Sequence, residues 1–199
     1  MMKTLLALFC GVTVAVWAAL VGAQQPAAVV GMPTVEKKLK ELPPGPLFWR
    51  VENLATLSEA EAAAGPAGLA AAISGKVWLF TLGPKGGATP GATLVAEIGP
   101  VPSLDAPEYL LRIMRATGAP GAQSQQHSHP GSEAFYVLQG RLGMRTPHGT
   151  VHADEGTAMN GHGADMPMQL LSAGTVDLEV LVIFLVDATR PFSSPARFD

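Results

Sequence analysis

The most informative stretch of the sequence is Gly121-Ala122-Gln123-Ser124-Gln125-Gln126-His127-Ser128-His129-Pro130-Gly131-Ser132-Glu133. Residues two apart on an extended chain project from the same face, so the imidazoles of His127 and His129 should lie side by side. Pro130-Gly131 predicts a turn, and Glu133 begins an apolar strand, so the turn can return its carboxylate to the imidazoles. Two imidazole nitrogens and one carboxylate oxygen suit a divalent first-row transition metal with open positions for water or substrate.

The spacing of these residues resembles the first signature motif of the cupin superfamily. Gly121, His127, His129, Glu133 and, further along the chain, Gly140 occupy every fixed position of that motif. The resemblance implies an all-β fold built as an antiparallel cupin (jelly-roll) barrel. It also implies that His127, His129 and Glu133 hold one divalent transition metal, which could be Fe, Mn, Cu, Zn or Ni.

The resemblance is compatible with more than one activity. One function is dioxygenase- or lyase-like chemistry on a small oxygenated organic molecule, whose oxygen donors would bind the open positions of the metal. Glu133 would then either remain a ligand or leave the metal to accept a proton. The alternative is a non-catalytic cupin that binds a small ligand or has a structural role, because one fold hosts both kinds of protein. By the same analogy we expect a homodimer.

The chain departs from the second cupin motif, Pro-x-Gly-x-x-His-x-x-x-Asn, whose histidine is the fourth metal ligand. Aligning this motif on Ser172-Ala173-Gly174 places Met168 at the histidine position. Met168 could be a soft ligand, which would favour copper, or an apolar neighbour of a metal with three protein ligands. Loss of the metal is a third interpretation, which the intact set of three donors disfavours. The alternative fourth group is His162, in the glycine-flanked loop 160–163.

The rest of the sequence independently predicts an all-β domain. Short apolar segments alternate with Gly-rich turns from Tyr109 to Val186, which is typical of an antiparallel sandwich or barrel. We therefore expect a cupin domain at 46–199 with its barrel core at about 108–187. A short N-terminal extension should contain a strand at 47–51, a helix at 57–64 with Ser58 as its N-cap, and a hairpin at 69–82. Residues 191–195 should pack across an open end of the barrel.

The first 23 residues resemble a secretory signal peptide. Lys3 precedes an uncharged apolar run that ends in the small-x-small pattern Val21-Gly22-Ala23. A membrane anchor is the competing interpretation, but a run rich in Ala, Gly and Val is a weak anchor. Cleavage would remove Cys10, the only cysteine, and would exclude a disulfide or thiol nucleophile from the mature protein. We therefore expect a periplasmic or secreted protein that has no membrane contact after cleavage. Residues 24–45 should form a linker that precedes the domain.

Composition limits the class of protein and its partners. Of the 199 residues, 48% are hydrophobic and 15% are charged, a balance too apolar for a disordered chain. The formal net charge of −3 argues against a nucleic-acid-binding surface and leaves a small molecule as the expected partner. The sequence has no Gly-x-Ser-x-Gly elbow, His-Glu-x-x-His pair or phosphate-binding loop, which disfavours the hydrolases and nucleotide-binding enzymes that use them.

Overall fold

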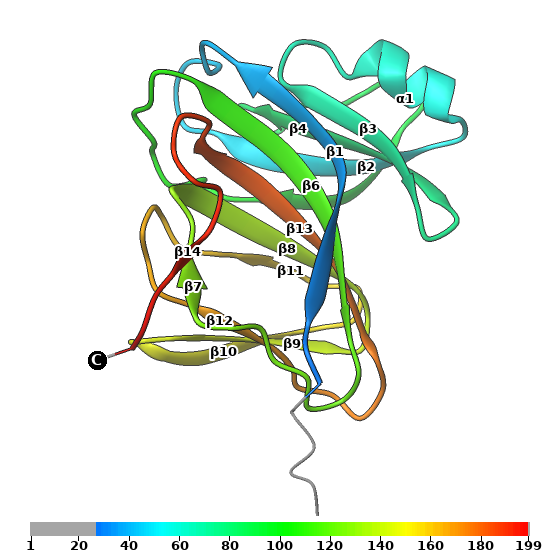
Figure 1. The fold of residues 1–199 in the computed structure, drawn as a ribbon. Helices are drawn as coiled ribbons and strands as arrows, with labels where there is room; N and C mark the ends of the chain where they lie inside the picture. The colour runs from blue at the N-terminus through cyan, green and yellow to red at the C-terminus, as the bar shows by residue number, and fades with distance from the viewer. Residues whose placement is uncertain (1–26, 199) are drawn as a thin grey trace, which may run out of the picture.

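The computed structural model describes residues 27–198, so the predicted signal peptide at 1–23 lies outside the described residues. The described chain folds into three β-layers (Figure 1). The middle layer is a five-stranded antiparallel sheet, which supplies one wall of a barrel. Its strands, in order across the sheet, are β1 (Val30–Leu39), β6 (Tyr109–Gly118), β13 (Leu178–Asp187), β8 (Gly131–Gln139) and β11 (Ala158–Asn160).

The opposite wall of the barrel is a three-stranded antiparallel sheet. Its strands, in order, are β10 (Gly149–Asp154), β9 (Arg141–Thr146) and β12 (Gln169–Ser172). Two short strands, β7 (His127–Ser128) and β14 (Ser194–Pro195), pair at one side of the barrel. Apolar side chains of both walls meet inside it, and they include Phe135, Val180, Leu142, Met144 and Met168. The strands from β6 to β13 fall within the predicted barrel core at 108–187, and their antiparallel pairing confirms the predicted fold class.

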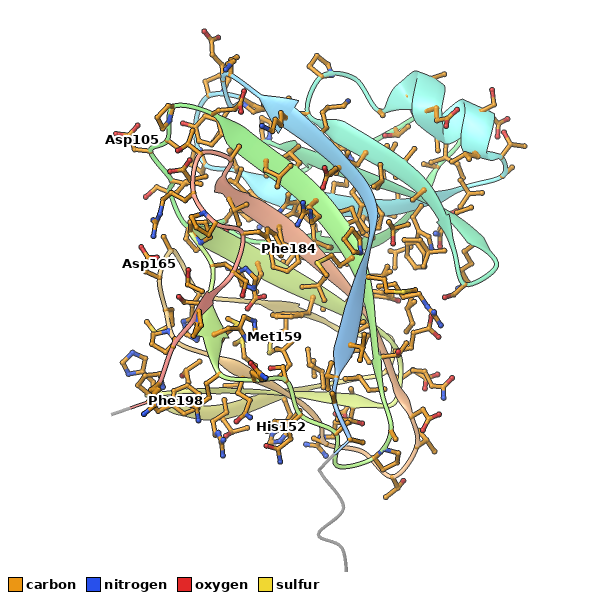
Figure 2. All side chains as sticks on the ribbon, in the orientation of Figure 1. Asp105, His152, Met159, Asp165, Phe184 and Phe198 are labelled. Atoms are coloured by element: carbon orange, nitrogen blue, oxygen red, sulfur yellow. The ribbon has the colours of Figure 1, made fainter. Side chains whose placement is uncertain are left out.

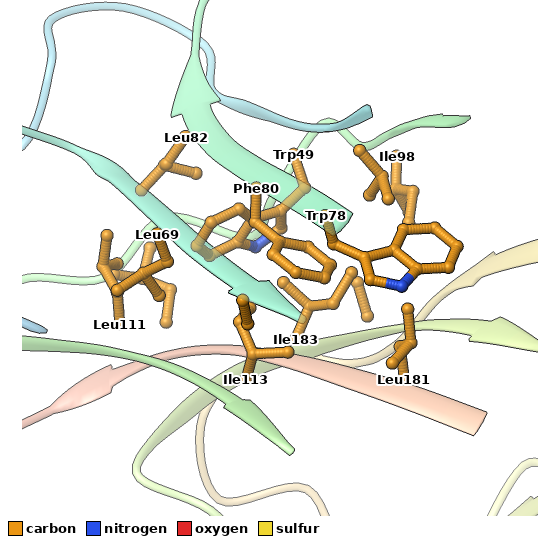
Figure 3. Close-up of a cluster of buried hydrophobic side chains, with 14 of the residues drawn as sticks. Trp49, Leu69, Trp78, Phe80, Leu82, Ile98, Leu111, Ile113, Leu181 and Ile183 are labelled. Carbon is orange, nitrogen blue, oxygen red and sulfur yellow. The ribbon is translucent and has the colours of Figure 1, made fainter. Parts of the chain in front are cut away.

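The third layer covers the other face of the middle sheet. It is a four-stranded antiparallel sheet of β3 (Gly68–Ile73), β4 (Lys76–Gly83), β2 (Phe48–Leu54) and β5 (Thr93–Ile98), and it carries the helix α1 (Leu57–Ala63). Figure 3 shows Trp49, Trp78 and Phe80 of this sheet packed against Ile113 and Ile183 of the middle sheet. The predicted strand, helix and hairpin of the extension are confirmed, although together they form a complete layer rather than a short extension.

The middle sheet is therefore buried on both faces, which explains the composition of β13. Successive residues of a strand point to opposite faces, so Val182 and Phe184 pack inside the barrel while Ile183 packs against the outer sheet. A strand buried on both faces reads as a continuous apolar run rather than as an alternating one. This accounts for the uninterrupted apolar sequence of residues 180–186.

The prediction of a linker at 24–45 is wrong for Val30–Leu39. These residues form β1, which pairs with β6 along its whole length and includes a register shift between Pro33 and Val35. β1 is an edge strand, and edge strands accept Pro, Lys and bulges because one side of their backbone needs no partner. Lys37 also ties β1 to the outer layer, since its Nζ donates hydrogen bonds to the carbonyl oxygens of Gly65 and Gly68.

Local signals explain two further boundaries. The N-cap of α1 is Thr56 rather than the predicted Ser58, and Thr56 forms a reciprocal capping box with Glu59. Gly140 connects β8 to β9 with a φ of 79°, and a Cβ at this position would lie 2.6 Å from the carbonyl oxygen of Asp177. The signature glycine at this turn is therefore required by both the backbone conformation and a close approach.

Helix α1 spans only two turns, and within residues 27–198 we find no helix with the length and apolar character needed to cross a bilayer.

Candidate functional site

A cavity of about 360 Å³ lies inside the barrel and contains all three predicted metal ligands. His127 comes from β7, His129 follows directly after it, and Glu133 lies in β8. Most of the remaining wall is apolar, and it includes Val29, Met114, Ala116, Leu170, Val182, Phe184 and Phe192. In Figure 2, Phe184 projects from β13 into the interior, whereas His152 of β10 points away from the barrel. The spacing of the signature thus predicted three neighbours within one cavity.

The two histidines are oriented by backbone carbonyls. The Nδ1 of His127 lies 2.8 Å from the carbonyl oxygen of Gln125, and the Nδ1 of His129 lies 2.6 Å from that of Phe192. A carbonyl only accepts hydrogen bonds, so each Nδ1 carries a proton, and in the neutral ring the lone pair is on Nε2. The two rings lie with their centroids 4.9 Å apart and nearly perpendicular. Both imidazoles therefore have the tautomer that a metal-binding Nε2 requires.

Glu133 is the most unusual polar group of the site. Its side chain is 3% exposed, and neither carboxylate oxygen has a hydrogen-bond partner among the described residues. Its Oε2 lies 4.0 Å from the Nε2 of His129. Burial disfavours the ionised form, so it raises the pKa of Glu133 to about 8.

The pKa of His129 is shifted in the opposite direction. Burial is the largest cause and lowers this pKa to about 4, although the hydrogen bond to the Phe192 carbonyl partly opposes the shift. The charges of His127 and Arg112 lower it further. At neutral pH the metal-free pair is consequently a neutral imidazole beside a largely protonated carboxyl group. The 4.0 Å contact between His129 and Glu133 is then not an ion pair.

Met168, which the alignment places at the histidine position of the second motif, lies directly opposite His127. The His127 N–H donates to the Met168 carbonyl at 3.0 Å, and the Met168 N–H donates to the His127 carbonyl at 2.8 Å. In such a hydrogen-bonded antiparallel pair, both side chains lie on the same face. The Met168 side chain is 3% exposed and packs in the apolar cluster of the barrel.

His162 occupies a different environment. Its ring centroid lies 6.4 Å from that of His148, which is exposed in the turn between β9 and β10. His162 does not line the cavity, but its loop approaches the site through the Gly161 N–H, which donates to the Glu133 carbonyl at 2.9 Å. The structure therefore pairs Met168, rather than His162, with His127, although Met168 does not line the cavity either.

The side chains of His127, His129 and Glu133 are suitable ligands for a divalent metal, although they do not converge on one point. Within residues 27–198, no three His, Cys, Asp or Glu side chains converge closely enough to surround an ion as they stand. The 4.0 Å between His129 Nε2 and Glu133 Oε2 is nevertheless short enough for one ion to contact both, since metal–ligand bonds to N and O are about 2.0–2.2 Å. The buried carboxylate without a partner is the group that such an ion would satisfy.

The C-terminal segment 188–198 is also part of the site, although the sequence predicts only packing for it. Its β14 pairs Ser194 with Ser128 and Pro195 with His127, and Phe192 to Pro195 line the cavity. The Phe192 ring packs at 4.8 Å from the His129 ring and at 4.9 Å from Phe184. The sequence predicted that residues 191–195 pack against the barrel, and residues 192–195 do line its cavity. Nothing in the sequence indicated that a backbone carbonyl there orients His129.

No family model matches the chain, and no curated protein sequence matches it. Several solved structures resemble part of the fold. A structure of the DMSP lyases RdDddP and RnDddQII is 20% identical with a TM-score of 0.37, and the match covers 44% of each chain. The polyketide cyclase RemF from Streptomyces resistomycificus is 19% identical with a TM-score of 0.37, over 45% of this chain and 62% of the cyclase.

A cupin-like protein from Thermotoga maritima is 16% identical with a TM-score of 0.38, over 43% of this chain and 64% of that protein. Each match thus spans less than two thirds of the other chain. The fold itself rests on the strand pairing described above. The solved structures that resemble part of this fold also include a cupin superfamily protein and a cupin domain.

Proposed function

We propose that the protein is an exported cupin that holds one divalent transition metal through His127, His129 and Glu133. The metal would bind the oxygen atoms of a small organic molecule, on which the protein would act as a dioxygenase- or lyase-like enzyme. The observation that carries this proposal is the Glu133 carboxylate, buried inside the cavity with no hydrogen-bond partner among the described residues. A buried polar group without a partner is costly, so its presence calls for a function.

The surroundings of the three donors support metal binding. Two backbone carbonyls hold both imidazoles with Nε2 available, and this kind of outer contact raises metal affinity. Glu133 and His129 are nearly fully buried, whereas His127 is half-buried and is the ligand with most freedom to rotate. A rotation of His127 is therefore the simplest change that would complete the set.

The residues around the donors would serve the chemistry in distinct ways. A bound divalent ion supplies Lewis acidity to the oxygen atoms of the molecule. Phe184 and Phe192 would exclude water from the apolar side of the cavity. Glu133 could hold a proton at Oε2 when it is not a ligand, because burial raises its pKa to about 8. Imidazole, carboxylate and an apolar wall thus provide binding, proton transfer and water exclusion in one place.

Metal content and thermal unfolding test the proposal. Protein purified without added metal should contain about one equivalent of a divalent metal, and removal by a chelator should lower the melting temperature. A metal at one hundred times its dissociation constant adds about 2.7 kcal/mol, or about 5–10 °C for a domain of this size.

Matched histidine variants separate this site from adventitious binding. His129→Ala should abolish both the metal and the chelation effect, whereas His152→Ala, at an exposed position outside the cavity, should preserve both. A full equivalent of metal in the His129→Ala protein would overturn the proposal.

A further inference from the structure

We propose that the molecule bound in this cavity is largely apolar, about the size of a single substituted ring, and carries at most one negative charge. This inference rests on the proposed metal function and specifies the class of substrate. It excludes phosphorylated molecules and sugars, which are also small and rich in oxygen. The inference follows from the composition, charge and volume of the cavity wall.

The apolar and polar groups of the cavity are segregated. β6, β12 and β13 contribute the apolar residues Met114, Leu170, Val182 and Phe184. The polar lining residues come from the segments 124–133 and 193–194, and they are Ser124, Gln125, Gln126, His127, His129, Glu133, Ser193 and Ser194. A molecule that fills the cavity would therefore place its oxygen atoms at one end and hydrocarbon along the rest. A sugar has hydroxyl groups on every side, and burying hydroxyl groups against an apolar wall leaves them without hydrogen bonds.

No lysine or arginine is among the described residues that line the cavity. The nearby Arg112 lies outside that lining and is already engaged, since its guanidinium pairs with Glu36 at 2.6 Å and stacks on the Phe192 ring at 4.1 Å. A divalent ion together with the Glu133 carboxylate would leave one net positive charge, which suits a single anionic oxygen. A phosphate group would bring a second negative charge into the cavity with no cation to pair it, which is unfavourable.

The volume sets the size of the molecule. The cavity has a volume of about 360 Å³. This lies at the lower end of the range for small-molecule pockets, about 300–1,000 Å³. One substituted ring fits within such a space.

Three probes of similar size test the inference on the metal-loaded full chain by isothermal titration calorimetry. The first probe is 2-hydroxyacetophenone, which has one ring and two oxygen atoms on neighbouring carbons. The second is phenyl phosphate, which has the same ring and a phosphate group. The third is glucose. We expect 2-hydroxyacetophenone to bind at least tenfold more tightly than either of the others. Equal or tighter binding of phenyl phosphate or glucose would overturn the inference.

A charge introduced into the wall gives a sharper test. Met114 is half-buried and lines the cavity on β6, so Met114→Lys places a cation inside it. This variant should improve the affinity for phenyl phosphate at least tenfold. Val151→Lys, at a half-exposed position outside the cavity, is the matched control and should leave that affinity unchanged. An equal effect of the two lysines would contradict the inference.

Failure of this inference can be distinguished from failure of the proposed function. Metal content is measured separately on the same preparations, so protein that binds metal but prefers phenyl phosphate refutes only the substrate class. If no metal binds, titration of the metal-free protein still compares the two ring compounds. A preference for phenyl phosphate there would refute the apolar-ligand inference by itself.

Discussion

Two glutamates are buried to the same depth in this molecule, one in the outer sheet and one in the barrel. Glu52 of β2 is 2% exposed, and its carboxylate is fully engaged. It pairs with Arg50 at 2.9 Å and accepts hydrogen bonds from the backbone N–H and the hydroxyl of Thr89, at 3.0 and 2.8 Å. These contacts fasten the loop before β5 to the sheet, so Glu52 has a structural role.

Glu133 of β8 is 3% exposed, yet it has none of these contacts among the described residues. Its neighbour in sequence, Ala134, points to the opposite face and packs in the solid core beneath the outer sheet. One strand thus places a core residue on one face and an incompletely satisfied carboxyl group on the other. Burial alone therefore does not distinguish a candidate functional carboxyl group from a structural one. Glu133 is distinguished by a carboxylate that borders a cavity and has no hydrogen-bond partner among the described residues.

The largest expected effect is on the free energy of unfolding, and it compares a substitution in the core beneath the outer sheet with one in the cavity wall. Phe80 is fully buried and stacks near Trp78, so Phe80→Ala should reduce the free energy of unfolding by about 3–5 kcal/mol. Phe192→Ala should cost clearly less, because Phe192 is half-buried and borders an existing cavity. Urea denaturation of both variants checks this order, and equal losses would show that the two regions are packed alike.

The second prediction compares the glutamates directly in metal-free protein at pH 8. Glu52→Gln should destabilise the fold by about 2–3 kcal/mol, because it weakens charge-assisted hydrogen bonds and leaves Arg50 without its anion. Glu133→Gln should cost nothing or increase stability, since no protein group loses a partner. Chemical denaturation in the presence of a chelator measures both changes. A comparable loss in the two variants would remove the distinction drawn here.

The third prediction concerns the pH dependence of the metal-free protein. Because burial raises the pKa of Glu133 above its ordinary value of 4.5 to about 8, its stability contribution is complete below pH 4.5 and is lost as the pH rises through 8. Between pH 6.5 and pH 8 the wild-type protein should lose about 2 kcal/mol relative to Glu133→Gln. Thermal unfolding of both proteins across this range measures the difference.

His129 does not interfere with that comparison. Its pKa is lowered from 6.5 to about 4, so its contribution is present above pH 6.5 and is lost only as the pH falls toward 4. Both groups change protonation below pH 6.5, but between pH 6.5 and pH 8 only the Glu133 contribution changes. Parallel pH profiles for the wild type and the Glu133→Gln variant would mean that the carboxyl group is solvated.

The sequence predicted the segment that carries the site better than it predicted the edge strand of the same barrel wall. His127, His129 and Glu133 lie close together along the chain, so local spacing was enough to place them in one cavity. The strand Val30–Leu39 was missed because its partner β6 is far away in sequence and an edge strand tolerates the Pro and Lys residues that indicate a loop. Local patterns are informative only where the contacts are local.

The support of the site depends on contacts that no local pattern contains. The Phe192 carbonyl reaches the Nδ1 of His129 across 63 positions of the chain, through a backbone atom that every residue type possesses. Side-chain identity therefore could not reveal it. The alignment to a family motif singled out Met168, but the pairing of Met168 with His127 came only from the structure, because the two residues are far apart in the sequence.

The smallest effect is expected at Met168, which lies at the boundary between the packed part of the barrel and the cavity. Because Met168 pairs directly with His127, a histidine at this position would project on the same face as the His127 imidazole. Imidazole binds intermediate divalent metals better than a thioether does, so Met168→His should raise the affinity for manganese, iron or zinc. A tenfold gain, equivalent to about 1.4 kcal/mol, is the expected size, measured by metal titration.

Met168→Leu is the control for this change, and it decides whether the sulfur itself contacts the metal. The side chain is almost fully buried among apolar neighbours, so a swap that conserves volume should cost less than about 1.5 kcal/mol of folding free energy. Copper affinity should fall in the Leu variant only if the sulfur is a ligand, because a thioether is a soft donor and a hydrocarbon donates nothing. If the native, His and Leu proteins bind every metal equally, residue 168 belongs entirely to the packed region. The boundary between that region and the cavity then runs between Met168 and His127, even though their backbones are hydrogen-bonded to each other.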